Sequence, residues 1–136
     1  MCIVCTSLLL CKQGKFLAFG STAREDYYEH DESGMLFEKF KMRLHDDHRG
    51  SEPIAFALNG KTLSLLKVIT HSLKYVKEDA MAEINRSQPK ALFAHEIKWV
   101  ITGKSHVPDR FWAWCTRSWT LGTRLRYERL SYSLFL

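Results

Sequence analysis

The clearest hydrophobic pattern in the chain lies between Ser64 and Arg86. Apolar residues recur there at steps of three and four, on one stripe of an α-helix: Leu66, Ile69, Leu73, Val76, Ala80 and Ile84. Ser64 is a residue type favoured at a helix N-cap, and Pro89 follows where a helix cannot easily continue. The pattern predicts one long amphipathic helix whose stripe packs on an apolar surface, and it indicates core packing rather than a cofactor site.

Two β-hairpins are predicted before this helix. Residues 7–20 hold two short apolar runs on either side of Lys12-Gln13-Gly14, where glycine can adopt a positive φ. In residues 54–63, Ile54, Phe56 and Leu58 alternate with smaller residues and lead into Asn59-Gly60, a dipeptide typical of tight hairpin turns. We therefore expect the second hairpin to lead directly into the long helix.

A short helix is predicted between the two hairpins. Thr22 and Glu25 have the spacing of a capping box, so the helix should run to about His30, and the polar residues 31–34 should end it. Residues 35–48 fit two patterns, because Leu36, Phe40 and Leu44 suit a helix while Phe40, Met42 and Leu44 suit a strand. For that segment we favour a short helix or turn.

A buried strand is predicted after Pro89. Ile97–Thr102 is apolar, and because Trp99 and Val100 are consecutive rather than alternating, we expect both faces of the strand to be covered. Hairpins, a long helix and a following strand together favour the α/β class.

Composition changes the interpretation of the last part of the chain. The 136 residues suit one domain with a real core, and the net charge is +5. Residues 1–100 carry a net charge of only +1, whereas residues 101–136 carry +4 and hold three of the four Trp without a helical or strand period. We therefore divide the chain into residues 1–102 and a divergent basic aromatic tail, 103–136. So abrupt a change is typical of an altered reading frame, an alternative exon or a truncated gene model.

The tail also allows a sharper interpretation. Its aromatic residues are interleaved with arginines, a mixture that can stack on bases and neutralise phosphates, or lie on a membrane surface. The residues concerned are Phe111, Trp112, Trp114, Trp119 and Tyr127, with Arg117, Arg124, Arg126 and Arg129. No nucleic-acid motif or clean amphipathic pattern accompanies them, so we do not expect a nucleic-acid partner.

Cysteine and histidine positions do not predict a metal site. The four cysteines follow no regular framework, which favours a reducing, cytoplasmic location over a disulfide-stapled secreted domain. Cys2-x-x-Cys5 lacks the second ligand pair that a structural zinc site requires. His45-Asp46-Asp47-His48 is followed by Arg49-Gly50 and resembles an exposed turn. No apolar run is long enough to span a bilayer.

Four blocks of sequence carry a family resemblance. They are FLAFGSTAREDYYE (Phe16–Glu29), LFEKFKMRLH (Leu36–His45), NGKTLSLLKVITHSLKYVKEDAMAEI (Asn59–Ile84) and IKWVIT (Ile97–Thr102). In this order and with short spacers, they resemble the divergent branch of the 70-kDa heat-shock family, in particular the heat shock 70 kDa protein 12 group. The resemblance covers residues 6–102 and implies part of an actin-like, ribonuclease H-like ATPase lobe, from a chaperone-related parent that binds ATP and Mg²⁺.

The phosphate-binding part of this resemblance is missing. The family's Asp-Phe-Gly-Thr type loop precedes the matched region. Phe19-Gly20-Ser21-Thr22 has a similar sequence, but in the family this stretch corresponds to the second strand of a later hairpin. No Walker-type or Gly-x-Gly-x-x-Gly segment replaces that loop. We expect a fragmentary or truncated relative that lacks a complete ATP site and does not hydrolyse ATP alone. The alternative is a non-catalytic module that binds protein partners through exposed apolar lobe surface.

One nucleotide contact is carried over from the resemblance. The family has a lysine in the segment equivalent to Leu36–Leu44, and a cation there can stabilise phosphate charge in the transition state. Lys41 or Lys39 is its candidate counterpart, although a gapless match places Phe40 at that position. The simpler interpretation is that Lys39, Lys41 and Arg43 form the solvated face of an amphipathic segment.

Overall fold

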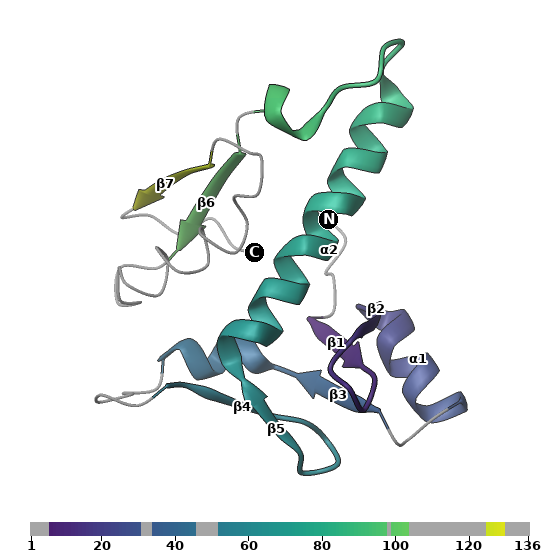
Figure 1. The fold of residues 1–136 in the computed structure, drawn as a ribbon, viewed down its shortest axis with the longest axis vertical. Helices are drawn as coiled ribbons and strands as arrows, with labels where there is room; N and C mark the ends of the chain where they lie inside the picture. Colours follow the sequence, from purple (N-terminus) through teal and green to yellow (C-terminus); the bar gives the residue numbers. More distant parts are fainter. Residues whose placement is uncertain (1–5, 31–33, 46–51, 98, 104–124, 130–136) are drawn as a thin grey trace. The chain divides into compact units, whose positions relative to one another are not determined.

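The computed structural model describes residues 6–30, 34–45, 52–97, 99–103 and 125–129 (Figure 1). The chain divides into two compact units, Met1–Ser72 and Leu73–Leu136, each of which is described by itself below. The division falls inside the long helix. The boundary predicted after residue 102 stays a prediction.

A three-stranded antiparallel sheet forms the centre of the first unit. β1 (Ser7–Leu10) lies between β2 (Phe16–Phe19) and β3 (Met35–Glu38) and pairs with both. The predicted first hairpin is therefore confirmed. Its turn places Gly14 at a φ of 79°, a conformation that costs glycine little, and the backbone N–H of Cys11 donates to the carbonyl of Lys15 at 2.8 Å.

One face of this sheet packs against α1 (Ser21–Glu29), as Figure 1 shows. The register places Leu9 opposite Ala18 on one side and Leu36 on the other, so the three side chains share a face. They form a buried cluster with Ala23 and Tyr27 of α1. An ion pair at the rim, Arg24 Nε to Glu38 Oε1 at 2.9 Å, also joins the helix to β3.

The other face of β1 is buried as well. Leu8 and Leu10 have no exposed surface, and neither has Phe37, which stands opposite Leu8. A strand that is covered on both faces needs a continuous apolar run rather than an alternating one. The sequence Leu8-Leu9-Leu10 meets that need, which explains why this short strand can occupy the centre of the unit.

Two local predictions between the hairpins are wrong in part. The predicted helix exists, but it begins at Ser21 with Gly20 as its N-cap at φ 74°, so Thr22 lies inside the helix and no capping box forms. The segment from Met35 is a strand as far as Glu38, because pairing with β1 decides its conformation. The favoured helix or turn begins only at the 3₁₀-helix η1 (Phe40–His45).

The second hairpin has the predicted form and is tied to β3. β4 (Ile54–Phe56) pairs with β5 (Thr62–Ser64), and Gly60 takes a φ of 81° in the turn. The Leu58 N–H donates to the Leu36 carbonyl at 2.8 Å, and Asn59 Nδ2 donates to the Gly34 carbonyl at 2.7 Å. These two bonds join the hairpin to a strand about 20 residues earlier in the chain.

The long helix α2 (Leu65–Ser87) follows β5 directly and matches its predicted range to within one residue. In its first two turns two residues of the predicted stripe, Leu66 and Ile69, are buried. Three neighbours outside that stripe are buried with them: Leu65, Val68 and Ser72. The Ser64 hydroxyl donates to the Glu52 carboxylate. The first turns of α2 therefore contribute to the core of the first unit.

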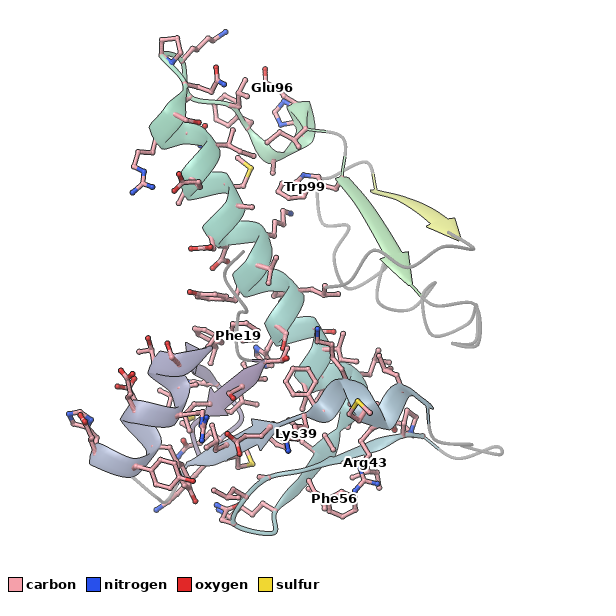
Figure 2. All side chains as sticks on the ribbon, turned by 180° about the vertical axis from the view of Figure 1, so that it is seen from behind. Phe19, Lys39, Arg43, Phe56, Glu96 and Trp99 are labelled. Carbon is pink, nitrogen blue, oxygen red and sulfur yellow. The ribbon has the colours of Figure 1, made fainter. Side chains whose placement is uncertain are left out.

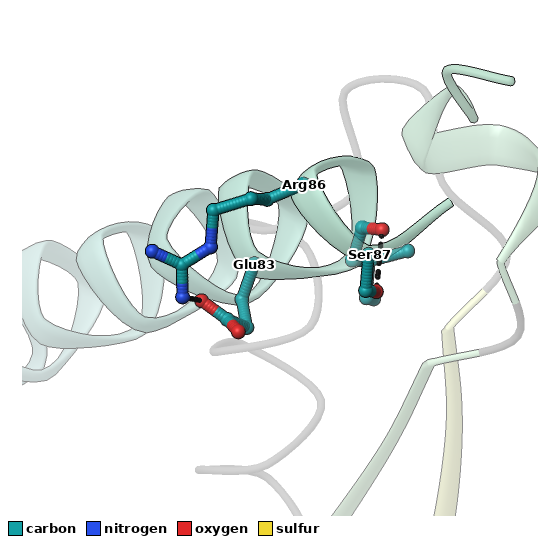
Figure 3. Close-up of polar contacts among 4 residues, drawn as sticks. Glu83, Arg86 and Ser87 are labelled. Atoms are coloured by element: carbon teal, nitrogen blue, oxygen red, sulfur yellow. Dashed lines mark hydrogen bonds and ion pairs between the residues drawn. The ribbon is translucent and has the colours of Figure 1, made fainter. Parts of the chain in front are cut away.

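The later part of α2 belongs to the second unit, where its stripe is less covered. Val76 is 42% exposed, and Leu73, Ala80 and Ile84 are only half-buried. At the C-terminal end Arg86 pairs with Glu83, and the Ser87 hydroxyl donates to the Ile84 carbonyl at 2.9 Å, as Figure 3 shows. The helix thus ends just before Pro89, as predicted.

One side chain of α2, that of Asn85, binds the backbone of the segment that follows the helix. Asn85 accepts from the backbone N–H of Leu92 at 2.7 Å through Oδ1 and donates to the Leu92 carbonyl at 3.2 Å through Nδ2. A short 3₁₀-helix, η2 (Ala94–Glu96), then leads to β6 (Trp99–Gly103), and Trp99 Nε1 donates to the Ala94 carbonyl at 3.1 Å. The predicted strand is therefore confirmed. The prediction that both of its faces are covered concerns side chains that lie outside the described residues.

A strand that the sequence analysis does not predict completes this unit. β7 (Leu125–Arg129) lies in the tail and pairs in parallel with β6, with Ile101 opposite Tyr127. The described residues are thus α/β in class, with small sheets and two α-helices.

Burial on both faces of the central sheet predicts a large effect of truncating Phe37. Phe37→Ala should lower the free energy of unfolding by about 3–5 kcal/mol, because it leaves a cavity beside Leu8. Phe56→Ala, at a ring that is 52% exposed, should cost about 1 kcal/mol or less. Urea denaturation followed by circular dichroism measures both.

The milder variant Phe37→Leu keeps this test valid where the alanine variant does not fold. It should still destabilise the chain more than Phe56→Ala does. Equal losses at positions 37 and 56 would contradict the assignment of the core.

Candidate functional site

The two predicted nucleotide contacts lie at the junction between β3 and η1. Lys39 follows the last residue of β3 and has a φ of 52°, in the left-handed region that a lysine rarely adopts. The conformation costs about 1 kcal/mol or more, and the Met42 N–H, which donates to the Lys39 carbonyl at 3.0 Å, helps to hold it. The side chain of Lys39 is exposed.

Phe40 anchors this junction in the core. It is only 4% exposed, so the residue that a gapless match places at the family lysine is a packing residue here. Lys39 and Lys41 flank it in the sequence, and both retain some solvent-exposed surface. Figure 2 shows Lys39 and Arg43 on this segment. The structure thus brings the predicted cations into one short stretch at the edge of the core.

Lys41 differs from Lys39 in being half-buried. Loss of water around the ammonium group disfavours its charged form, so burial lowers the pKa of Lys41 below the usual lysine value of 10.5. A cation in such surroundings is screened less by water than one on an open surface. This makes Lys41 the stronger of the two candidates for an electrostatic role.

Arg43 joins η1 to the second hairpin. Its guanidinium carbon lies 4.6 Å from the centroid of the Phe56 ring, within the range of a cation–π interaction (Figure 2). The interpretation of Lys39, Lys41 and Arg43 as one solvated face therefore needs a correction. Lys39 and Arg43 are exposed, with Arg43 over an aromatic ring, whereas Lys41 is half-buried and does not match that description.

The outward face of β4 is unusual for an antiparallel hairpin. The small residues Ala55 and Ala57 are buried, while Ile54, Phe56 and Leu58 are 46%, 52% and 54% exposed. Alternation predicted the strand correctly, but the larger side chains face outward. Met42 of η1 is a further exposed apolar residue, at 65%. We call Met42, Ile54, Phe56 and Leu58 the β4 face. The exposed apolar surface expected from the sequence is found at these residues.

The glycine segment that imitates a phosphate loop lies where the family resemblance places it. Phe16–Phe19 is the second strand of a hairpin, and Gly20 is the N-cap of α1. No side-chain cap bond forms at this helix start.

The remaining candidate ligands fall partly or wholly outside the described residues. Cys2, Cys5 and His48 lie outside them, and so do the aromatic residues predicted at positions 111–119. His45 is the last residue of η1, and Cys11, which is half-buried, accepts from the Lys15 N–H at 3.4 Å. Among the residues that the structure describes, no group of three metal-binding side chains occurs. Within the same residues, no helix has the length and apolar character needed to cross a bilayer.

Comparison with known proteins gives one consistent set of relatives. The chain is 35% identical to human heat shock 70 kDa protein 12B over 102 residues, which are 71% of this chain and 15% of that protein. The mouse and human heat shock 70 kDa protein 12A are 33% and 32% identical over 102 residues, with the same shares of each chain. No protein-family model and no solved structure matches. The chain thus spans about 15% of the length of these curated relatives.

The buried position of Lys41 predicts a pH dependence of stability. Since its folded-state pKa is lowered, the unfolded chain binds more protons between that pKa and 10.5. The free energy of unfolding should therefore rise with pH across this window, whereas below it the full cost of burying the charge opposes folding. An NMR titration of the Lys41 ε-methylene group should give a lower midpoint in the folded chain than in urea.

The variant Lys41→Met serves as the control for this titration. It should lose the increase in stability across the alkaline window, as measured by urea denaturation at a series of pH values. Identical midpoints for Lys41 in the folded and unfolded chain would contradict the assignment.

Proposed function

This chain is a relative of the heat shock 70 kDa protein 12 proteins, and on that premise we propose that it forms part of a nucleotide-binding lobe of the actin-like ATPase type. The observation that carries the proposal is the match over 102 residues. The order of the described elements supports it, since two hairpins, a long helix and a strand follow one another as in the matched blocks. The chaperone-related role of the parent is part of the same proposal, and the cysteine pattern supports a cytoplasmic location.

Lys41 is our first candidate for a phosphate contact in the complete lobe, and Lys39 is the second. Phe40 is buried between them, so the core fixes the backbone positions from which both lysine side chains extend. A positioned cation stabilises the charge that develops on a transferring phosphoryl group. Half-burial strengthens this effect at Lys41, because the surrounding water is reduced.

We further propose that these 136 residues do not hold ATP and Mg²⁺ tightly by themselves. Phosphate cradles in nucleotide-binding proteins are built from glycine-rich loops with several backbone N–H donors, and the sequence contains no such motif. One or two lysines neutralise charge without replacing that cradle. Catalysis by the chain alone is therefore not part of the proposal.

Isothermal titration of the full chain with Mg-ATP tests this point. The expected result is no binding in the micromolar range and no release of phosphate above the uncatalysed rate. Micromolar binding would contradict the proposal that the chain lacks a complete ATP site. If such binding occurred and Lys41→Gln removed it, the lysine assignment would survive and the missing-site claim would not.

The β4 face supports a second candidate function, that of a protein-binding module. Antiparallel sheets that face water normally carry polar residues on that side. Here three large apolar residues, alternating with buried alanines, occupy it instead. Lys41 and Arg43 lie on the adjoining η1, which contacts β4, and Lys39 directly precedes it. We therefore propose an occupant with both acidic and apolar side chains, such as an amphipathic acidic segment of another protein.

The anionic hydrophobic dye ANS is a simple probe of this face. Its fluorescence should rise on binding the full chain, and Phe56→Ser should remove about half of that signal, because the ring supplies much of the exposed apolar area. Leu17→Ser on β2, at a side chain that is equally exposed at 52%, is the matched control and should have little effect. A chain that binds no dye, or equal losses in both variants, would refute a special role of the β4 face.

A further inference from the structure

A groove on the first unit runs between its two hairpin turns. Lys12, Gln13 and Gly14 of the first turn form one wall, and residues 60–63, from the second turn and the start of β5, form the other. Met35, the first residue of β3, also lines it. The groove has a volume of about 530 Å³, which is within the usual range of small-ligand sites. It contains neither Lys39 nor Lys41.

Hydrogen bonds hold both walls in place. In the first turn, the Gly14 N–H donates to the Cys11 carbonyl at 2.9 Å. In the second, Asn59 donates to the Gly34 carbonyl at 2.7 Å and accepts from the Lys61 N–H at 3.2 Å. The second turn is therefore fixed to the strand that lies beside the groove, and the site exists before any ligand arrives.

The chemistry of the lining selects an anion with an apolar part. Lys12 and Lys61 stand on opposite walls, and none of the lining residues that the structure describes carries a carboxylate. Lysine ammonium groups are common phosphate binders, and Thr62 and Gln13 add neutral polar groups. Leu63 is half-buried and offers apolar surface next to the cations, whereas Met35 is buried, at 5% exposure. A carboxylate ligand would use fewer of these groups than a doubly charged phosphate would.

We propose that this groove binds a small phosphomonoester, with Lys12 and Lys61 at the phosphate and Leu63 against its apolar substituent. The proposal does not depend on the ATP-related function, because the two sets of residues are separate. An open groove of this kind should bind weakly. We expect a dissociation constant in the millimolar range, which corresponds to a standard binding free energy of about −4 kcal/mol.

The test is an NMR titration of the ¹⁵N-labelled full chain with phenyl phosphate and with inorganic phosphate. The amide signals of Gly14 and Gly60 should shift and saturate, and phenyl phosphate should bind about three- to tenfold more tightly because its ring contacts Leu63. Lys12→Gln and Lys61→Gln should each weaken binding several-fold, and the double variant should abolish saturation. Leu63→Ala should remove the advantage of phenyl phosphate while leaving inorganic phosphate binding unchanged.

Lys15→Gln is the matched control, because Lys15 is an exposed lysine of the same hairpin that does not line the groove. It should leave both affinities unchanged. Equal weakening by Lys15→Gln would show that phosphate responds only to the net positive charge of the hairpin and would contradict the proposal. An absence of saturable shifts would overturn it directly. Either result would leave the Mg-ATP titration unaffected, since Lys12 and Lys61 are not part of that claim.

Discussion

Burial of β1 on both faces is the constraint on which the first unit depends. A four-residue strand with three consecutive leucines requires neighbours on both edges and cover on both sides. β2 and β3 supply the edges, and α1 covers the face that contains Leu9. The opposite face contains Leu8, Leu10 and Phe37, which are fully buried. The residues in the first turns of α2 are buried in the same unit. Elements that lie far apart in the sequence therefore share one small core.

The functional candidates lie where this core meets the surface. Buried Phe40 fixes the segment that carries Lys39 and Lys41, and the bond from Leu58 to Leu36 fixes the hairpin that carries the β4 face. The same hairpin forms one wall of the groove. The first unit thus presents cations and apolar surface on backbone that the core and these hydrogen bonds hold in place. The chain is related to the heat shock 70 kDa protein 12 proteins over 15% of their length.

Local signals in the sequence were sufficient for some elements and insufficient for others. Asn59-Gly60 and the helical period after Ser64 are short-range patterns, and both predicted their elements correctly. Met35–Glu38 and Leu125–Arg129 are strands because of partners distant in the sequence, which no window around them reveals. The start of α1 shows a third case, in which Gly20 became the N-cap although a capping box was available one residue inside the helix. In the same way, Lys41 and Lys39 were found from a family block, whereas Lys12 and Lys61 share a groove only because two hairpin turns meet over β3.

Native-state hydrogen exchange of the full chain tests the central role of β1 most directly. Backbone amides within the β1 strand should exchange only through global unfolding of the first unit, with the highest protection of any described segment in residues 6–72. The amides of β4 and β5 should exchange faster, because that hairpin has one exposed face. Protection of β1 no greater than that of the β4–β5 hairpin would contradict the account.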